Sequence, residues 1–168
     1  MSRSLTRRLA ALTLLVLITP MAARAAHAQV LNCTVTATPV VFGTYTPMQP
    51  TAFSGTGTIT TVCTVASEKN NITVALSAGA SSGFTKRTMT TTVGTATNPL
   101  NYNLYQDAAN TVIWGDGTGG SQSNTVLLMR HANNPVITTN LTVYGAVAPL
   151  QDPVPGIYSD GINVTVNF

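Results

Sequence analysis

The chain has 168 residues and a formal net charge of +3, yet only 8% of its residues are charged. Four of the eight basic residues lie within the first 24 positions, so residues 29–168 carry four basic and five acidic side chains, a net charge of −1. This balance excludes a basic surface for nucleic acid, and we expect no nucleic-acid partner. The abundance of threonine and valine favours a sheet protein, because β-branched residues are enriched in strands.

The N-terminal residues have the features of an export signal. A basic stretch precedes a short apolar run at 9–18, and a small-x-small cleavage motif follows at 26–28. The pattern predicts a cleaved signal peptide over residues 1–28, with cleavage after Ala25 as the alternative. The apolar run is shorter than the roughly 20 residues that a membrane span requires. We therefore expect residues 29–168 to form one exported, soluble domain, which is an ordinary domain size.

Many short segments of the remaining chain alternate between apolar and polar residues, and this period predicts strands. In chain order the predicted strands cover residues 33–37 with a continuation at 40–45, then 57–64, 72–78, 87–89 with 91–93, 100–105, 112–114, 126–129, 140–147 and 161–168. Turns rich in glycine, proline and asparagine separate them. This arrangement predicts an all-β protein, an antiparallel sandwich.

The last predicted strand alternates strictly. Its apolar face comprises Ile162, Val164, Val166 and Phe168, and its polar face comprises Asn163, Thr165 and Asn167. Such a pattern is typical of a half-buried strand. Because the sequence stops on this strand, we expect it to be available for pairing with a strand of another protein.

Two cysteines, Cys33 and Cys63, lie in the predicted domain, one in each of its first two strands. An even number of cysteines in an exported chain favours a disulfide. Closing a loop of about 30 residues would stabilise the domain by roughly 3–4 kcal/mol in the chain-entropy model. A metal site is a poor alternative, because two cysteines with the single histidine His131 make no convincing ligand set. We expect neither a metal nor another cofactor.

Seven pieces of sequence, in order, carry a resemblance to the spore coat protein U domain family, which includes subunits of archaic chaperone–usher pili. The pieces are Cys33-Thr34-Val35, Phe42-Gly43-Thr44-Tyr45, Arg87-Thr88-Met89, Leu100-x-Tyr102-x-Leu104-Tyr105-x-Asp107, Trp114-Gly115-Asp116-Gly117-Thr118-Gly119-Gly120, Val143-Tyr144-Gly145 and Gly156-x-Tyr158-Ser159-Asp160. The resemblance implies an immunoglobulin-like sandwich that lacks its final strand. It also implies donor-strand complementation, in which a periplasmic chaperone lends a strand and a neighbouring subunit replaces it at the outer-membrane usher.

The function implied by this resemblance is structural or adhesive: a fimbrial subunit that supports attachment and biofilm formation at the cell surface. Its partners would be a periplasmic pilus chaperone, the outer-membrane usher and other pilin subunits. The apolar face of the last strand, Ile162, Val164, Val166 and Phe168, would line the groove and bind the chaperone or donor strand. A spore or cell-envelope coat protein that does not polymerise is the alternative.

The N-terminus departs from the pattern of a polymerising subunit. Cleavage after Ala28 would leave only residues 29–32 ahead of Cys33, fewer than the about ten alternating residues of a donor strand. One reading is a tip, minor or terminating subunit, or a coat protein outside a long fibre. The other is that the first strand begins later than predicted, which would free more residues for donation.

Nothing in the sequence indicates an enzyme, and no catalytic residue is assigned. His131 could join a serine and an aspartate in a hydrolase, but the serines lie in turn-like contexts, as at Ser54-Gly55 and Ser77-Ala78-Gly79, and we expect His131 to be a solvated loop histidine. The glycine-rich loop at 115–120 has one carboxylate, so we expect a tight connection instead of a calcium site. Trp114, Tyr102 and Tyr105 are expected in packing and not in a carbohydrate platform. Loop-adjacent apolar residues that could mediate adhesion are Val40, Phe53, Val112 and Leu150.

Overall fold

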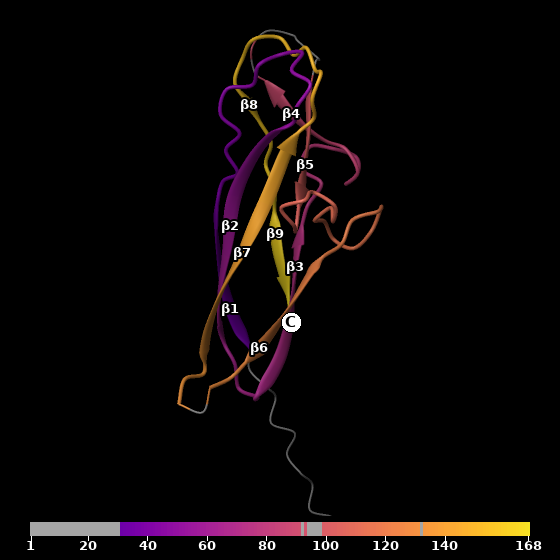
Figure 1. Ribbon diagram of the computed structural model, residues 1–168. Coiled ribbons are helices and arrows are strands. Elements are labelled where there is room, and N and C mark those ends of the chain that lie inside the picture. Colours follow the sequence, from indigo (N-terminus) through magenta and orange to yellow (C-terminus); the bar gives the residue numbers. More distant parts are fainter. Residues whose placement is uncertain (1–30, 92, 94–98, 132) are drawn as a thin grey trace, which may run out of the picture.

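The computed structural model describes residues 31–91, 93, 99–131 and 133–168, so the predicted signal peptide at 1–28 lies outside the described residues. The strands of the described residues are β1 (Asn32–Thr38), β2 (Phe53–Thr64), β3 (Lys69–Leu76), β4 (Arg87–Thr91), β5 (Leu100–Tyr105), β6 (Asn124–Met129), β7 (Val136–Val147), β8 (Tyr158–Ser159) and β9 (Val164–Asn167). Figure 1 shows the long strands β2 and β7 running along an elongated molecule. No helix of this part of the chain is long and apolar enough to cross a membrane.

The strands form two sheets with antiparallel pairing throughout. The larger sheet has the order β1-β2-β7-β5-β4-β8, and the smaller one has the order β6-β3-β9. In the larger sheet the long strands β2 and β7 pair along twelve residues each, from Phe53 opposite Val147 to Thr64 opposite Val136. The expected all-β antiparallel sandwich is confirmed.

The core lies between the sheets and follows from the alternation of the strands. Residues of β2 that point to one face are buried, among them Ile59 and Cys63, while their chain neighbours are exposed or half-buried. From the smaller sheet, Ile72 and Val74 meet them, each with no exposed surface. Apolar burial of this kind is the main stabilising contribution in a sandwich.

A disulfide joins Cys33 to Cys63, as predicted. The two residues are direct partners in the register of β1 and β2, so the bond fastens the edge strand β1 to its neighbour β2. The structure also begins β1 at Asn32 and not later in the chain.

Two predicted strands are wrong. Residues 40–45 alternate but belong to no strand, and residues 112–114 form only isolated bridges, Ile113 with Tyr105 and Trp114 with Gln122. Alternation reports which side chains face the core, whereas a strand also requires a neighbouring backbone to bond with. The 40–45 segment turns side chains towards the core but has no neighbouring backbone to bond with. It forms part of the site described below.

Candidate functional site: an open groove

The core-facing side of β1 is uncovered. Val35 lies directly opposite Thr61 and Ala37 opposite Ile59 in the antiparallel register, and such partners point to the same face of a sheet. Thr61 and Ile59 are buried, yet Val35 is 40% exposed and Ala37 is also exposed. The side chains of β1 therefore face the core at a place where nothing of the described chain covers them.

The last strand, β9, has the same property at the edge of the smaller sheet. Val166 pairs with Val74 and Val164 with Leu76, and both partners are buried. Val164 and Val166 themselves are only half-buried, and Phe168 is 66% exposed. The two edge strands β1 and β9 thus border an open groove, and each presents apolar side chains to it.

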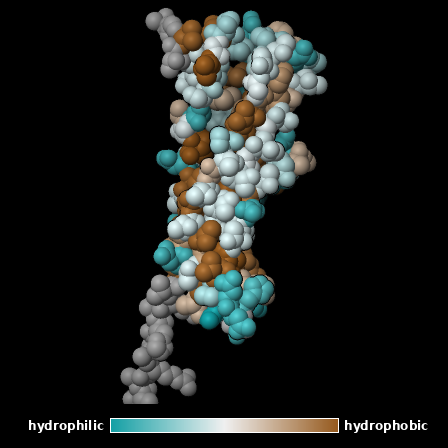
Figure 2. Space-filling view, turned by 90° about the vertical axis from the view of Figure 1, so that its left-hand side faces the viewer, coloured by the Kyte–Doolittle hydropathy of each residue, from teal (hydrophilic) through white to brown (hydrophobic). Residues whose placement is uncertain are grey.

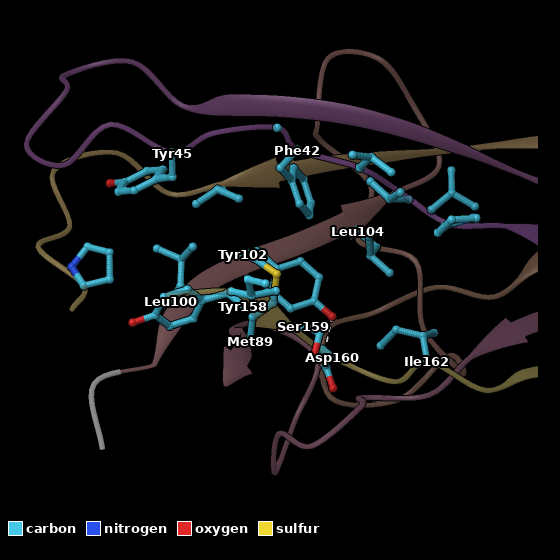
Figure 3. A pocket seen from close by; sticks show the side chains of 18 of the residues that line it. Phe42, Tyr45, Met89, Leu100, Tyr102, Leu104, Tyr158, Ser159, Asp160 and Ile162 are labelled. Carbon is cyan, nitrogen blue, oxygen red and sulfur yellow. Dashed lines mark hydrogen bonds between the residues drawn. The ribbon is translucent and has the colours of Figure 1, made fainter. Parts of the chain in front are cut away.

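At one end the groove widens into a cavity of about 1010 Å³. One wall is the 39–47 segment, and the opposite wall comes from residues 153–160 with Ile162 and Val164. In Figure 3, Phe42 points from the first wall into the cavity towards Tyr102 in β5, and Tyr158 in β8 lies on the side opposite that wall. The floor consists of inward side chains of the larger sheet: Met89, Leu100, Tyr102, Leu104, Val143 and Val147.

The surface on the β1 side agrees with this description. Figure 2 views the molecule from that side and shows apolar residues recurring along its length among neutral and polar ones. The strands β1, β2 and β7 contain no charged residue at all. A partner for this groove would therefore be recognised by shape, apolar contact and backbone hydrogen bonds and not by charge.

One polar pair lies in the wall of the cavity. The Tyr102 hydroxyl donates to Asp160 Oδ2 at 2.7 Å, and the Ala80 N–H donates to Asp160 Oδ1 at 2.9 Å. Burial, together with the hydrogen bond to Asp160, raises the pKa of Tyr102 well above its usual range, so the phenol stays protonated. Gly79 lies against this carboxylate with φ +68°, and a Cβ there would overlap it. The contacts fix the chain between β8 and β9.

A buried arginine, Arg87, connects the strands next to the cavity by hydrogen bonds. Arg87 has no exposed surface and donates to Asn103 Oδ1 at 2.6 Å, to the Trp114 carbonyl at 2.7 Å and to the Ser77 carbonyl at 3.0 Å. Its side chain also lies 5.3 Å from the centre of the Phe84 ring. Burial lowers the pKa of Arg87, and these acceptors compensate for the lost hydration. Ser77 follows β3 and Asn103 lies in β5, so the guanidinium connects the two sheets.

The remaining candidate sites have structural explanations. Asp116 accepts hydrogen bonds from the N–H and hydroxyl of Thr118 at 2.8 and 2.7 Å, which explains the tight loop at 115–120. Trp114 and Tyr102 are buried, as packing residues are. Among the described residues, no group of three His, Cys, Asp or Glu side chains lies close enough together to hold a metal ion. Of the adhesion candidates only Leu150 is exposed; Val40, Phe53 and Val112 are half-buried.

A sequence profile of the Spore Coat Protein U domain matches residues 19–165, nearly the whole chain. The chain belongs to the Spore Coat Protein U domain family. This family is one of pilin-like structural domains and not of enzymes. No curated protein has a significantly similar sequence.

A solved structure similar to this Spore Coat Protein U domain is that of the CsuC–CsuE chaperone–tip adhesion subunit pre-assembly complex from archaic chaperone–usher Csu pili of Acinetobacter baumannii. The TM-score is 0.54 at 21% sequence identity, and the match covers 83% of this chain and 40% of that chain. This chain thus corresponds to less than half of that longer one. The likeness shows the fold: an incomplete immunoglobulin-like pilin sandwich, open on one side. Family and disulfide together indicate an exported protein.

The structure brings together the predicted groove residues only in part. Ile162 and Val164 line the cavity, Val166 is half-buried further along β9, and Phe168 lies exposed at its end. The sequence did not reveal the β1 side of the groove, which comprises Val35 and the 39–47 segment. The alternation at 33–37 and 40–45 was a usable signal, since it marked inward-facing positions that no strand of the described residues covers.

Proposed function

We propose that this protein is a structural subunit of a chaperone–usher fimbria, assembled by donor-strand complementation and supporting surface attachment and biofilm formation. The single observation that carries the proposal is the pair of edge strands, β1 and β9, whose core-facing side chains are left uncovered. An extended strand from another protein would cover both. It would form backbone hydrogen bonds to the edges and place alternate side chains inside the groove.

The energetics support a need for such a strand. Burying about four apolar side chains contributes roughly 1.5–3 kcal/mol each. The sum is comparable to the roughly 5–15 kcal/mol that stabilise a typical domain. A subunit without a donor strand would therefore have low stability, and its open edge would favour aggregation.

The proposal extends to partners, location and processing. The first partner would be a periplasmic pilus chaperone, followed by the outer-membrane usher and other pilin subunits at the cell surface. Ile162, Val164, Val166 and Phe168 would contact the inserted strand. Residues 1–28 would be removed as a signal peptide, which mass spectrometry of the exported protein tests directly.

Thermal unfolding of the oxidised, exported protein, alone and with a pilus chaperone or donor-strand peptides, tests the proposed function. At a donor concentration about 100-fold above Kd, mass action adds about 2.7 kcal/mol. For a domain of this size that corresponds to a rise in Tm of about 10 °C. A cooperative transition at high temperature that no donor shifts would favour the alternative, a coat protein whose sandwich is already complete.

A matched pair of substitutions on β9 sharpens this test. Val164→Asp places a charge on the side facing the groove, and Thr165→Asp places the same charge on the exposed side of the same strand. We expect the donor-induced rise in Tm to be lost in Val164→Asp and retained in Thr165→Asp. Equal behaviour of the two variants would contradict donor binding along β9.

A further inference from the structure

The 39–47 segment lies unusually close to the larger sheet. It leaves β1 after Thr38 and crosses the inner face of β2 and β7 above glycines. A Cβ on Gly145 would lie 2.7 Å from Val40 Cγ1 and 2.8 Å from the Phe42 ring, and a Cβ on Gly57 would lie 2.7 Å from the Thr38 carbonyl oxygen. Only residues without a side chain permit this approach, so the sequence of the sheet is adapted to the segment.

The backbone of this segment is nevertheless unsupported. In the part of the chain that the structure describes, no backbone hydrogen bond joins residues 40–44 to another segment. Phe42 packs on Tyr102 with ring centres 5.9 Å apart, while Val41 is 69% exposed. The segment also borders the cavity of about 1010 Å³, so packing holds it only on the side that faces the sheet. Besides these side-chain contacts, hydrogen bonds hold the segment at its far end.

Tyr45 and Gln151 fix that end. The Tyr45 hydroxyl accepts a hydrogen bond from the Gln151 N–H at 3.0 Å and lies 3.3 Å from the Gln151 carbonyl oxygen. The Gln151 side chain in turn accepts from the Asn101 N–H at 2.7 Å and donates to the Asn101 and Ala148 carbonyls at 3.0 and 2.8 Å. The Met48 N–H donates to the Gln151 carbonyl at 3.1 Å. These contacts, here termed the Tyr45–Gln151 clamp, connect the segment to the first residues of β5.

We infer that Tyr45 and Gln151 are positioning residues for strand acceptance: their clamp holds the 39–47 segment as a pre-ordered wall of the open cavity. The inference rests on the proposed function, because the wall is useful only if a strand enters beside it. A segment without backbone hydrogen bonds loses conformational entropy when it is ordered. With the clamp this ordering accompanies folding, so an incoming strand meets a preformed wall and does not have to order it.

Tyr45→Phe tests the inference, because it removes the hydroxyl and keeps the ring that packs on Phe53 at 4.9 Å. Tyr144→Phe, on the outward-facing side of β7, is the matched control. The probe is a synthetic peptide of about ten residues that alternates valine and threonine, the pattern of a strand with one buried face. We expect its association rate to fall about tenfold in Tyr45→Phe relative to the control, with an unchanged dissociation rate. An association rate equal to that of the control would overturn the inference.

A second measurement decides the inference without any peptide. Backbone 15N order parameters of residues 40–44 should be near ~0.85 in the wild type and below ~0.6 in Tyr45→Phe and in Gln151→Ala. The order parameters of β2 and β7 should stay unchanged, which distinguishes a positioning role from general loss of structure. If no peptide binds the wild type, the proposed function fails, and the order parameters still decide the clamp. A segment that stays rigid in both variants would contradict it.

Discussion

The two long sides of this sandwich are built from similar residues, yet one is closed and the other is open. On the closed side, Trp114 is fully buried and its indole N–H donates to the Val74 carbonyl at 3.0 Å, while Arg87 bonds acceptors from both sheets. On the open side, Val35 and Phe168 face the groove with much of their surface exposed. The difference lies in what the described residues supply: side chains that connect the sheets on one side, and no covering strand on the other.

Trp114→Ala should have the largest effect, because it acts on the closed side. Removing the indole leaves a large cavity and removes one hydrogen bond to the Val74 carbonyl, and we expect a loss of about 3–5 kcal/mol in the free energy of unfolding. Denaturant unfolding with and without a donor strand measures this. The loss should be the same in both states, since the closed side does not change on donor binding. A loss confined to the donor-bound state would contradict the division into two sides.

Loss of the disulfide should follow in size. The paired substitutions Cys33→Ala and Cys63→Ala should lower the free energy of unfolding by about 2–4 kcal/mol, because the cross-link restricts the unfolded chain. Chemical reduction of the wild type should give a similar loss, and this comparison is the control for the packing of the two side chains. Variants as stable as the oxidised wild type would show that β1 holds to β2 without the bond.

A smaller difference in the free energy of unfolding should distinguish substitutions on the inner and outer faces of the larger sheet. Val35 and Val62 have nearly equal exposure, 40% and 37%, but Val35 points into the groove and Val62 points outward. Each substitution to alanine should cost less than about 1 kcal/mol in the free protein, because neither side chain is buried. In the donor-bound protein, Val35→Ala should cost about 1 kcal/mol more than Val62→Ala, since only Val35 becomes buried. Calorimetric unfolding of both variants with and without donor measures the difference.

The smallest expected effect is a loss of stability at acidic pH. Asp107 is half-exposed and Asp116 is exposed, both on loops, and hydrogen bonds from Thr111, Val112 and Thr118 lower the pKa of their carboxyl groups from the ordinary 3.8. Because the folded pKa is lower than the unfolded one, this stabilisation is present above about pH 3.8 and is lost as the pH falls through the folded values. NMR titration of the carboxyl carbons should show both pKa values lowered. Asp107→Asn should make the turn that follows β5 insensitive to this change.

The sequence predicted most strands and their inward faces, and it failed where pairing depends on distant partners. Strict alternation located β1, β3, β5 and β9, with errors of a few residues at their ends. The same alternation at 40–45 predicted a strand that the structure lacks, because no strand of the described residues forms backbone hydrogen bonds with it. The two-residue strand β8 is too short to show a period.

The candidate site was predictable from one side only. The pattern of β9 marked Ile162 and Val164, which line the cavity, but the contact of the 39–47 segment with Gly57 and Gly145 joins residues far apart in sequence. The burial of Arg87 was equally unpredictable from the sequence. A charged residue in a chain of few charges is ordinarily expected at the surface, and only the surrounding acceptors permit its burial.

The position of the disulfide has a mechanical consequence. Cys33 is the second residue of β1 and is bonded to Cys63 in the neighbouring strand β2. A pulling force applied to the chain before Cys33 therefore passes through the sulfur–sulfur bond into β2, and the hydrogen bonds of residues 34–38 carry almost none of it. The load enters the sheet at β2, the strand that pairs with β7 along twelve residues.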